Sequence, residues 1–161
     1  IYNSIIENNY SSETDVYSTT ITTGGIVAVN STLVLNNNTF FGNSGGVVHG
    51  GAIHFDAGSN GTIINSIFWD NEGPEEITGS AAITFSNVQG GWEGEGNIDA
   101  DPLFIGGDPF NYHLTASSPC NATKPSGPVT SNPFPISWKC LILDARSNTL
   151  SNNNFAFITS V

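Results

Sequence analysis

A short pattern that recurs every few tens of residues constrains the fold of this chain most. The pattern is Asn, then Ser or Thr, two large apolar residues, any residue, and Asn or Asp. Copies begin at Asn3, Asn38 and Asn65, and a degenerate copy begins at Ser86, so the steps are 35, 27 and 21 residues. Repeats of roughly 20 to 50 residues are typical of solenoids, in which each repeat packs on its neighbours.

The residues between the copies favour strands over helices. The apolar runs are short, and Gly, Asn, Ser and Thr separate them. Gly and Asn accept a positive φ and suit turns, whereas Val, Ile, Phe and Thr suit strands. A helical repeat would need apolar residues at three-four spacing over a longer stretch. The sequence therefore predicts an all-β chain of short strands and tight turns.

A second column of residues advances in step with the first. Gly-Gly pairs begin at Gly24 and Gly50, 26 residues apart, and an apolar strand pattern follows each of them. Two columns that advance together predict a parallel coil with at least two strands per turn, in which equivalent residues stack about 4.8 Å apart. We expect complete coils over residues 24–43, 44–71 and 72–91.

The alternation of side chains along a strand predicts which residues stack inside the coil. The third coil is expected to use Glu76 to Thr78 in the first column and Ile83 to Val88 in the second. The predicted inward stacks are Val27 under Ile53, Val29 under Phe55, and a column of Ile5, Phe40, Ile67 and Val88. The predicted asparagine ladder at a turn contains Asn3, Asn38 and Asn65.

These patterns resemble a known repeat family. Gly50-Gly51-Ala52-Ile53 followed by the Asn motif is similar to the right-handed parallel β-helix repeat family and to repeats of bacterial polymorphic outer-membrane passenger domains. Residues 86–104, with 112–114 and 117–120, look like the terminal segment of secreted bacterial β-helix proteins. The resemblance implies a right-handed parallel β-helix.

The resemblance also implies a division of the chain. It covers residues 1–120, the coils and their closing loop, and stops abruptly at Asn121. Ile98, Leu103 and Phe104 are the expected anchors of the closing loop, and 110–114 is the expected last short strand. Residues 121–161 are expected to form a Pro-rich linker and an irregular tail or cap, and Cys120 and Cys140 are the one pair available for a disulfide.

The charge of the chain excludes several functions. It carries 14 acidic and 3 basic residues, and the basic ones, Lys124, Lys139 and Arg146, all lie beyond residue 120. Nucleic-acid binding requires a basic footprint, as does attraction to anionic lipid, so neither is expected. No apolar run is long enough to span a membrane.

The first residues of the sequence lie inside a repeat. We therefore expect a fragment or processed form that has lost N-terminal coils. A first rung without a cap would expose unpaired backbone groups. This predicts edge-to-edge self-association.

Two groups of charged residues are candidate cation or acid–base sites. If Ile53 and Phe55 point inward, His54 and Asp56 point outward, and the next coil would place Glu76 beside them. A solvated polar face is the simpler interpretation. No cofactor is expected apart from Ca²⁺ at Asp99 and Asp101, whose side chains are equally suited to forming turns. The remaining histidines, His49 and His113, are interpreted as turn or packing residues.

The aromatic residues Trp69 and Trp92 are candidates for stacking on sugars. Lyases common on this fold need a Lys or Arg base, which residues 1–120 lack, and a hydrolase needs two carboxyl groups at a defined separation, which no spacing singles out. The expected function is a secreted or cell-surface module that binds glycans or surface proteins and is not itself an enzyme. The alternative is the non-catalytic end of a pectate-lyase-like carbohydrate-active enzyme, with its site on missing coils.

Overall fold

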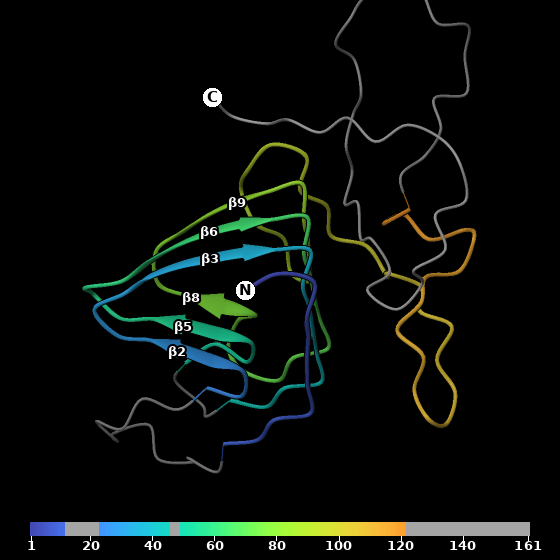
Figure 1. The fold of residues 1–161 in the computed structure, drawn as a ribbon, viewed down its shortest axis with the longest axis horizontal. Helices are drawn as coiled ribbons and strands as arrows, with labels where there is room; N and C mark the ends of the chain where they lie inside the picture. Colours follow the sequence, from blue (N-terminus) through green and yellow to red (C-terminus); the bar gives the residue numbers. More distant parts are fainter. Residues whose placement is uncertain (12–22, 46–48, 122–161) are drawn as a thin grey trace, which may run out of the picture.

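The computed structural model describes residues 1–11, 23–45 and 49–121 (Figure 1). All regular secondary structure in these residues is β, in short strands of two to five residues. The strands are β1 (Ile5–Glu7), β2 (Ile26–Ala28), β3 (Thr32–Asn36), β4 (Thr39–Phe41), β5 (Ile53–Phe55), β6 (Asn60–Ile64), β7 (Ile67–Trp69), β8 (Ile77–Thr78), β9 (Ala81–Thr84) and β10 (Asn87–Val88).

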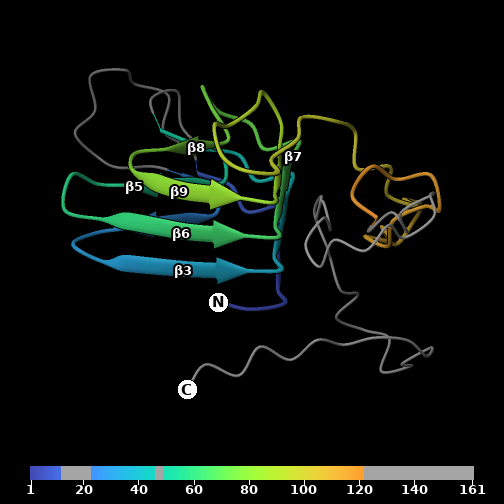
Figure 2. The ribbon, with the colours of Figure 1, turned by 90° about the horizontal axis from the view of Figure 1, so that it is seen from above.

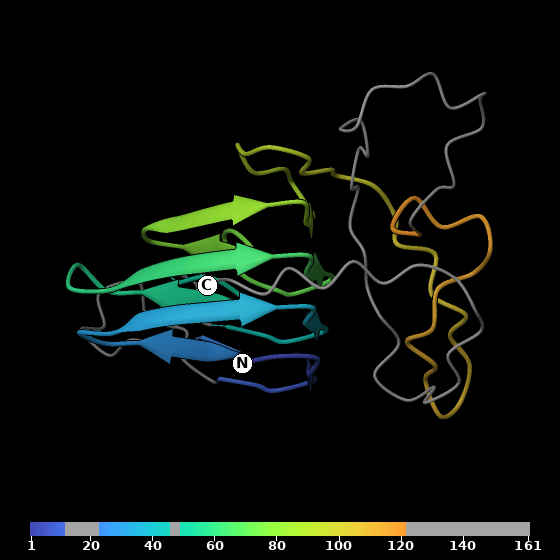
Figure 3. The ribbon, with the colours of Figure 1, turned by 45° about the horizontal axis from the view of Figure 1, so that its top comes forward.

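The strands form a parallel β-helix with three sheets. Their orders are β1-β4-β7-β10, β2-β5-β8 and β3-β6-β9, and every pairing between these strands is parallel. Figures 2 and 3 show the strands of successive coils stacked on one another. Residues 24–43, 44–71 and 72–91 each supply one strand to every sheet, so the predicted coils are confirmed. Each turn has three strands; the β3-β6-β9 sheet was not distinguished from the sequence.

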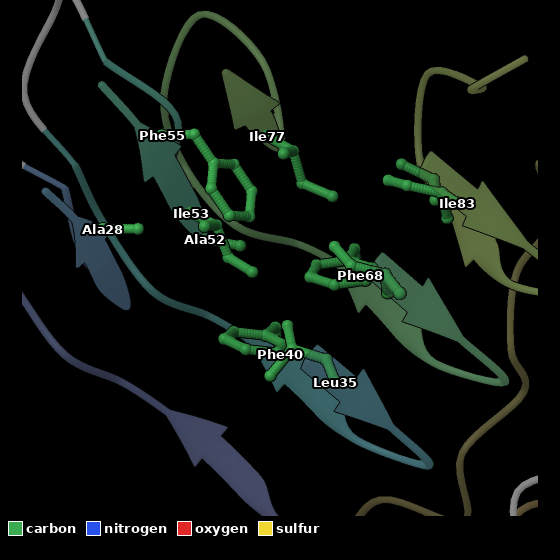
Figure 4. Close-up of a cluster of buried hydrophobic side chains, with 11 residues drawn as sticks. Ala28, Leu35, Phe40, Ala52, Ile53, Phe55, Phe68, Ile77 and Ile83 are labelled. Carbon is green, nitrogen blue, oxygen red and sulfur yellow. The ribbon is translucent and has the colours of Figure 1, made fainter. Parts of the chain in front are cut away.

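The core lies between the three sheets (Figure 4). Its aromatic centre is a stack of Phe40 on Phe68, with ring centroids 4.8 Å apart and planes 13° apart. Phe55 fills the space beside Gly61, where a Cβ would lie 2.4 Å from the Phe55 ring. Large side chains with at most 2 % exposure complete the core: Leu35, Ile53, Ile63, Ile77, Ile83 and Val88.

The predicted inward stack of the first column is wrong by one residue on its lower coil. Ile53 and Phe55 point inward as expected, but their partners are Ile26 and Ala28. Val27 and Val29 are instead 39 % and 51 % exposed. Matching the two Gly-Gly pairs misplaced the register, because the structure aligns Gly25 with Ala52. Since side chains alternate with period two, a slip of one residue reverses every facing.

The second column has a similar correction. The inward stack is Ile6, Phe40, Phe68 and Val88, so the predictions for Phe40 and Val88 are confirmed and those for Ile5 and Ile67 are wrong. Ile5 is 38 % exposed, whereas Ile67 faces outward and is buried under the closing segment.

The ladder predicted from the motif starts is also wrong. Register places Asn37, rather than Asn38, level with Asn3 and Asn65. These three residues have φ of 57°, 50° and 52°, so each turns a corner in the left-handed conformation that Asn tolerates. Asn38 instead stacks with Ser4 and Ser66: its Oδ1 accepts the Ser4 N–H and its own N–H donates to Ser66 Oγ.

Residues 92–121, called here the closing segment, first cover the last coil. Ile98 continues the parallel pairing beyond β10, with backbone hydrogen bonds of 3.0 Å from Val88 and 2.9 Å to Ser86. The segment then passes over the outer face of the β1-β4-β7-β10 sheet, where Ile98 and Phe104 pack around Ile67. Figure 3 shows it in yellow and orange beside the coils.

Two predictions for the closing segment are corrected. Leu103 is 36 % exposed with φ of 53° and is not an anchor, whereas Ile98 and Phe104 are. In place of a strand at 110–114, the structure has a single antiparallel bridge between Phe104 and Leu114. The predicted tail after residue 121, with Cys140, lies outside the described residues. The part of the chain that is described contains no helix long and apolar enough to cross a membrane.

Candidate functional site

A groove of about 1220 Å³ lies at one corner of the coils. Its walls are the turn between β7 and β8, the turn after β10, and the corner after β4. Asp70 and Gly90 take equivalent corner positions with φ of 59° and 85°, which bends the chain sharply at both levels. Gln89 ties the two turns together, because its Oε1 accepts the Asp70 N–H at 2.6 Å. The groove is thus built by two stacked corners.

The lining of the groove is acidic and partly aromatic. Trp92, partly buried against the core, and Phe41 contribute the aromatic surface. No Lys or Arg occurs among the described residues, because all three lie beyond residue 121. The carboxyl groups of the lining are those of Asp70, Glu72, Glu75, Glu76 and Glu93. This surface favours neutral or cationic ligands over anionic ones.

Glu76 is the buried carboxyl group of the groove, with 7 % of its surface exposed. Burial disfavours its charged form and raises its pKa to about 7, two hydrogen bonds from Asn71 oppose this shift, and the nearby Asp70 adds to it. A carboxyl group with such a pKa exchanges its proton near neutral pH.

Glu76 is also the end of an asparagine ladder that crosses the coils. Asn9 donates its backbone N–H and its amide to Asn43 Oδ1, at 3.2 and 2.9 Å. Asn43 donates in the same way to Asn71 Oδ1, at 3.0 and 2.7 Å. Asn71 then donates to the two oxygens of Glu76. The floor of the groove is therefore fixed by a continuous polar network.

The structure separates the residues predicted to form one cation or acid–base site. His54 and Asp56 lie on the outward side of β5 and just after it, as predicted. Glu76 is not beside them, which corrects that expectation. It precedes β8, level with Ala52, and its side chain turns to Asn71; Thr78 is the neighbour of His54, at 2.8 Å.

Asp56 has a role in a turn. Its carboxylate accepts the N–H groups of Asn30 and Gly58. The pKa of Asp56 is lowered, first by a hydrogen bond from the Ser59 side chain and further by these backbone bonds. These contacts are those of a carboxylate that stabilises a corner of the coil.

The two tryptophans do not share a surface. Trp92 lines the groove, whereas Trp69 points outward from β7 and is half-buried beside Ile67 under the closing segment. Asp101 Oδ1 accepts the Leu103 N–H at 2.8 Å, which is the turn-forming alternative for that residue. Within residues 1–11, 23–45 and 49–121, no three His, Cys, Asp or Glu side chains are grouped closely enough to hold a metal ion.

Sequence reasoning missed most of the groove. Gln89, Glu72 and Glu93 were not singled out, because they lie in turns whose stacking depends on the register. The available signal was the equivalence of Trp69-Asp70 and Gln89-Gly90 at the ends of two motif copies. His49, interpreted as isolated, lies against His54.

Comparison with known proteins gives no relative. No protein-family model, no curated protein and no solved structure matches this chain.

Proposed function

We propose that this protein is a secreted or cell-surface module of the right-handed parallel β-helix class and that it binds glycans in the groove beside Trp92. The observation that carries this proposal is an elongated polar hollow with an aromatic side chain in its wall. Aromatic rings stack on the apolar faces of sugar rings, while carboxyl and amide groups bind the hydroxyl groups.

The charge of the lining selects among glycans. Five carboxyl groups without a Lys or Arg in the described part of the chain would repel uronic acids and sulfated sugars. The proposed ligands are therefore neutral sugars or sugars with free amino groups. The Asn-, Ser- and Thr-rich turns, which carry few charges, support a role at an external surface.

The proposal is tested by measuring binding of the full chain to neutral, amino and acidic oligosaccharides by calorimetry. Trp92→Ala should weaken binding about tenfold, which corresponds to ~1.4 kcal/mol. Tyr10→Ala is the matched control, because Tyr10 is 74 % exposed and does not line the groove. Trp92→Phe, which keeps a ring, should retain most of the affinity. Equal affinity of the wild type and Trp92→Ala, or no binding of any sugar, would refute the proposal.

Hydrolysis of the bound glycan is a second candidate function, and the position of Glu76 favours it. Glu76 would act as the general acid and Asp70, which faces the same groove, as the second carboxyl group. The wild type would then release reducing ends from a bound oligosaccharide, Glu76→Gln would not, and Glu75→Gln would remain active. Binding without release of reducing ends excludes hydrolysis and leaves the glycan-binding proposal intact.

A further inference from the structure

A pair of histidines lies on the outer side of the β2-β5-β8 sheet. The rings of His49 and His54 meet at 72° with their centroids 4.4 Å apart. His54 is on β5, and Thr78 lies beside it on β8. None of these three residues lines the groove. The pair is therefore a feature that glycan binding does not use.

Thr78 can fix the tautomer of His54. Its Oγ1 lies 2.8 Å from His54 Nδ1 and also accepts the Gly50 N–H at 3.1 Å. A hydroxyl oxygen accepts two hydrogen bonds, so it can take the Nδ1–H of His54 as well. Nε2 of His54 then keeps its lone pair. A hydrogen bond from the other ring nitrogen is the usual support of a metal-binding histidine.

His49 contributes a nitrogen with unused bonding capacity. Its Nδ1 is buried, and none of the described residues forms a hydrogen bond with it. Leaving such an atom without a partner is costly, typically 1–3 kcal/mol. A metal bond to this ring would remove the cost, directly at Nδ1 after a small ring movement or through the opposite nitrogen once the ring has turned over.

The separation of the rings fits a shared ion. With nitrogen–metal bonds of about 2.1 Å and ligands at roughly right angles, two imidazoles on one ion have centroids about 4.5 Å apart. The observed separation is 4.4 Å. The pKa of His54 is lowered, first by burial and then by His49, which favours the neutral form that binds metals. The nearby Asp56 carboxylate acts in the other direction on this pKa and attracts cations.

We propose that His49 and His54 chelate a divalent transition-metal ion of the class that prefers imidazole, namely Cu²⁺, Ni²⁺ or Zn²⁺. Water completes the coordination, since no third His, Cys, Asp or Glu of the described residues joins the pair. Such a site holds its ion in exchange with solution. Binding would also join the loop before β5 to the sheet.

The test is a titration of the metal-free full chain with NiCl₂ and ZnCl₂ in a non-coordinating buffer at pH 7.5, followed by calorimetry. His49→Gln and His54→Gln should each weaken binding at least tenfold, and His113→Gln, at an exposed position outside the pair, should not. Thr78→Val should weaken it about 10- to 100-fold through loss of the tautomer support. Metal-free melting curves of every variant identify any that fails to fold.

A second readout assigns the ligands. Paramagnetic Ni²⁺ should broaden the imidazole NMR signals of His49 and His54 before that of His113. Unchanged affinity in the His49→Gln, His54→Gln double variant, or no binding by the wild type at millimolar metal, would overturn the proposal. Neither result bears on sugar binding, which Trp92→Ala tests separately.

Discussion

Asn71 donates two hydrogen bonds to the carboxyl group of Glu76: its side-chain amide bonds Oε2 at 2.6 Å, and its backbone N–H bonds Oε1 at 3.3 Å. Both residues are buried, so the carboxyl group closes the asparagine ladder away from bulk solvent. The charged form gains these two bonds but loses its hydration. Because the desolvation is the larger effect, the pKa is raised.

Glu76 should make stability fall as the pH rises. Its pKa is raised from 4.5 to about 7, so the folded state holds a proton that the unfolded state releases between these values. The stabilising contribution is complete below pH 4.5, is lost up to about pH 7, and amounts to about 3 kcal/mol. Urea unfolding at pH 4, 6 and 8 should show this loss in the wild type and its absence in Glu76→Gln. Glu75→Gln, at an exposed neighbour, should keep it; parallel profiles for the wild type and Glu76→Gln would contradict this account.

Asn43→Ala should destabilise the protein by on the order of 3 kcal/mol, because it leaves several buried polar groups without partners. The Asn43 side chain accepts two hydrogen bonds from Asn9 and donates to Ile6 O and Asn71 Oδ1. Asn60→Ala is the control, since Asn60 is exposed at the start of β6. Denaturant midpoints that shift equally in the two variants would show that the ladder does not stabilise the coils.

The sequence predicts the coils well, because strand and turn residues alternate with a period that no helical pattern shares. It predicts the register poorly. Three consecutive asparagines, 36–38, offer three ways to place one motif copy, and the glycine pairs at 24 and 50 offer a false match. The structure is decided instead by which alignment buries Phe40 on Phe68 and leaves Asn37 at the corner.

The groove could not be predicted for a related reason. Its walls come from turns on different coils, so an error of one residue in register moves Glu76 from the groove to the outer face near His54. Trp92 and Glu76 were singled out by residue type alone. Their common location follows from the way that residues 89–93 stack over the turn between β7 and β8, and this depends on tertiary packing.

Two substitutions at successive coils test the corrected register. Ile53→Asp places a charge in the core and should cost several kcal/mol, because Ile53 has no exposed surface. Val27→Asp should cost less than about 1 kcal/mol, because Val27 is 39 % exposed and faces outward beside His54. Thermal unfolding followed by circular dichroism measures both. Similar melting temperatures for the two variants would mean that the facing of the first column is wrong.

The closing segment should depend on its aromatic contacts. Phe104 packs edge-on against Phe41 at 5.7 Å and against Tyr112 at 5.6 Å, and Tyr112 donates a hydrogen bond to Glu7. Phe104→Ala should therefore cost about 3 kcal/mol and speed proteolysis within residues 99–121. Ile105→Ala, whose side chain is 56 % exposed, is the adjacent control. Equal cleavage rates in the two variants would show that Phe104 does not hold the segment on the sheet.

The two ends of the described coils differ, and we expect association through one of them. β1, β2 and β3 are the first strands of their sheets, whereas backbone bonds to Ile98 and Glu95 cover the end beyond β9 and β10. Unpaired strand edges attract other strands, and a formal net charge of −11 opposes this by repulsion. Light scattering should thus report a rising molecular mass as salt screens the charge. Ile5→Lys, which adds a cation on edge strand β1, should reduce the association, whereas Ile105→Lys, far along the chain on the closing segment, should not. A monomer at every salt concentration, with protease-resistant first residues, would contradict this prediction and indicate that the first rung is capped.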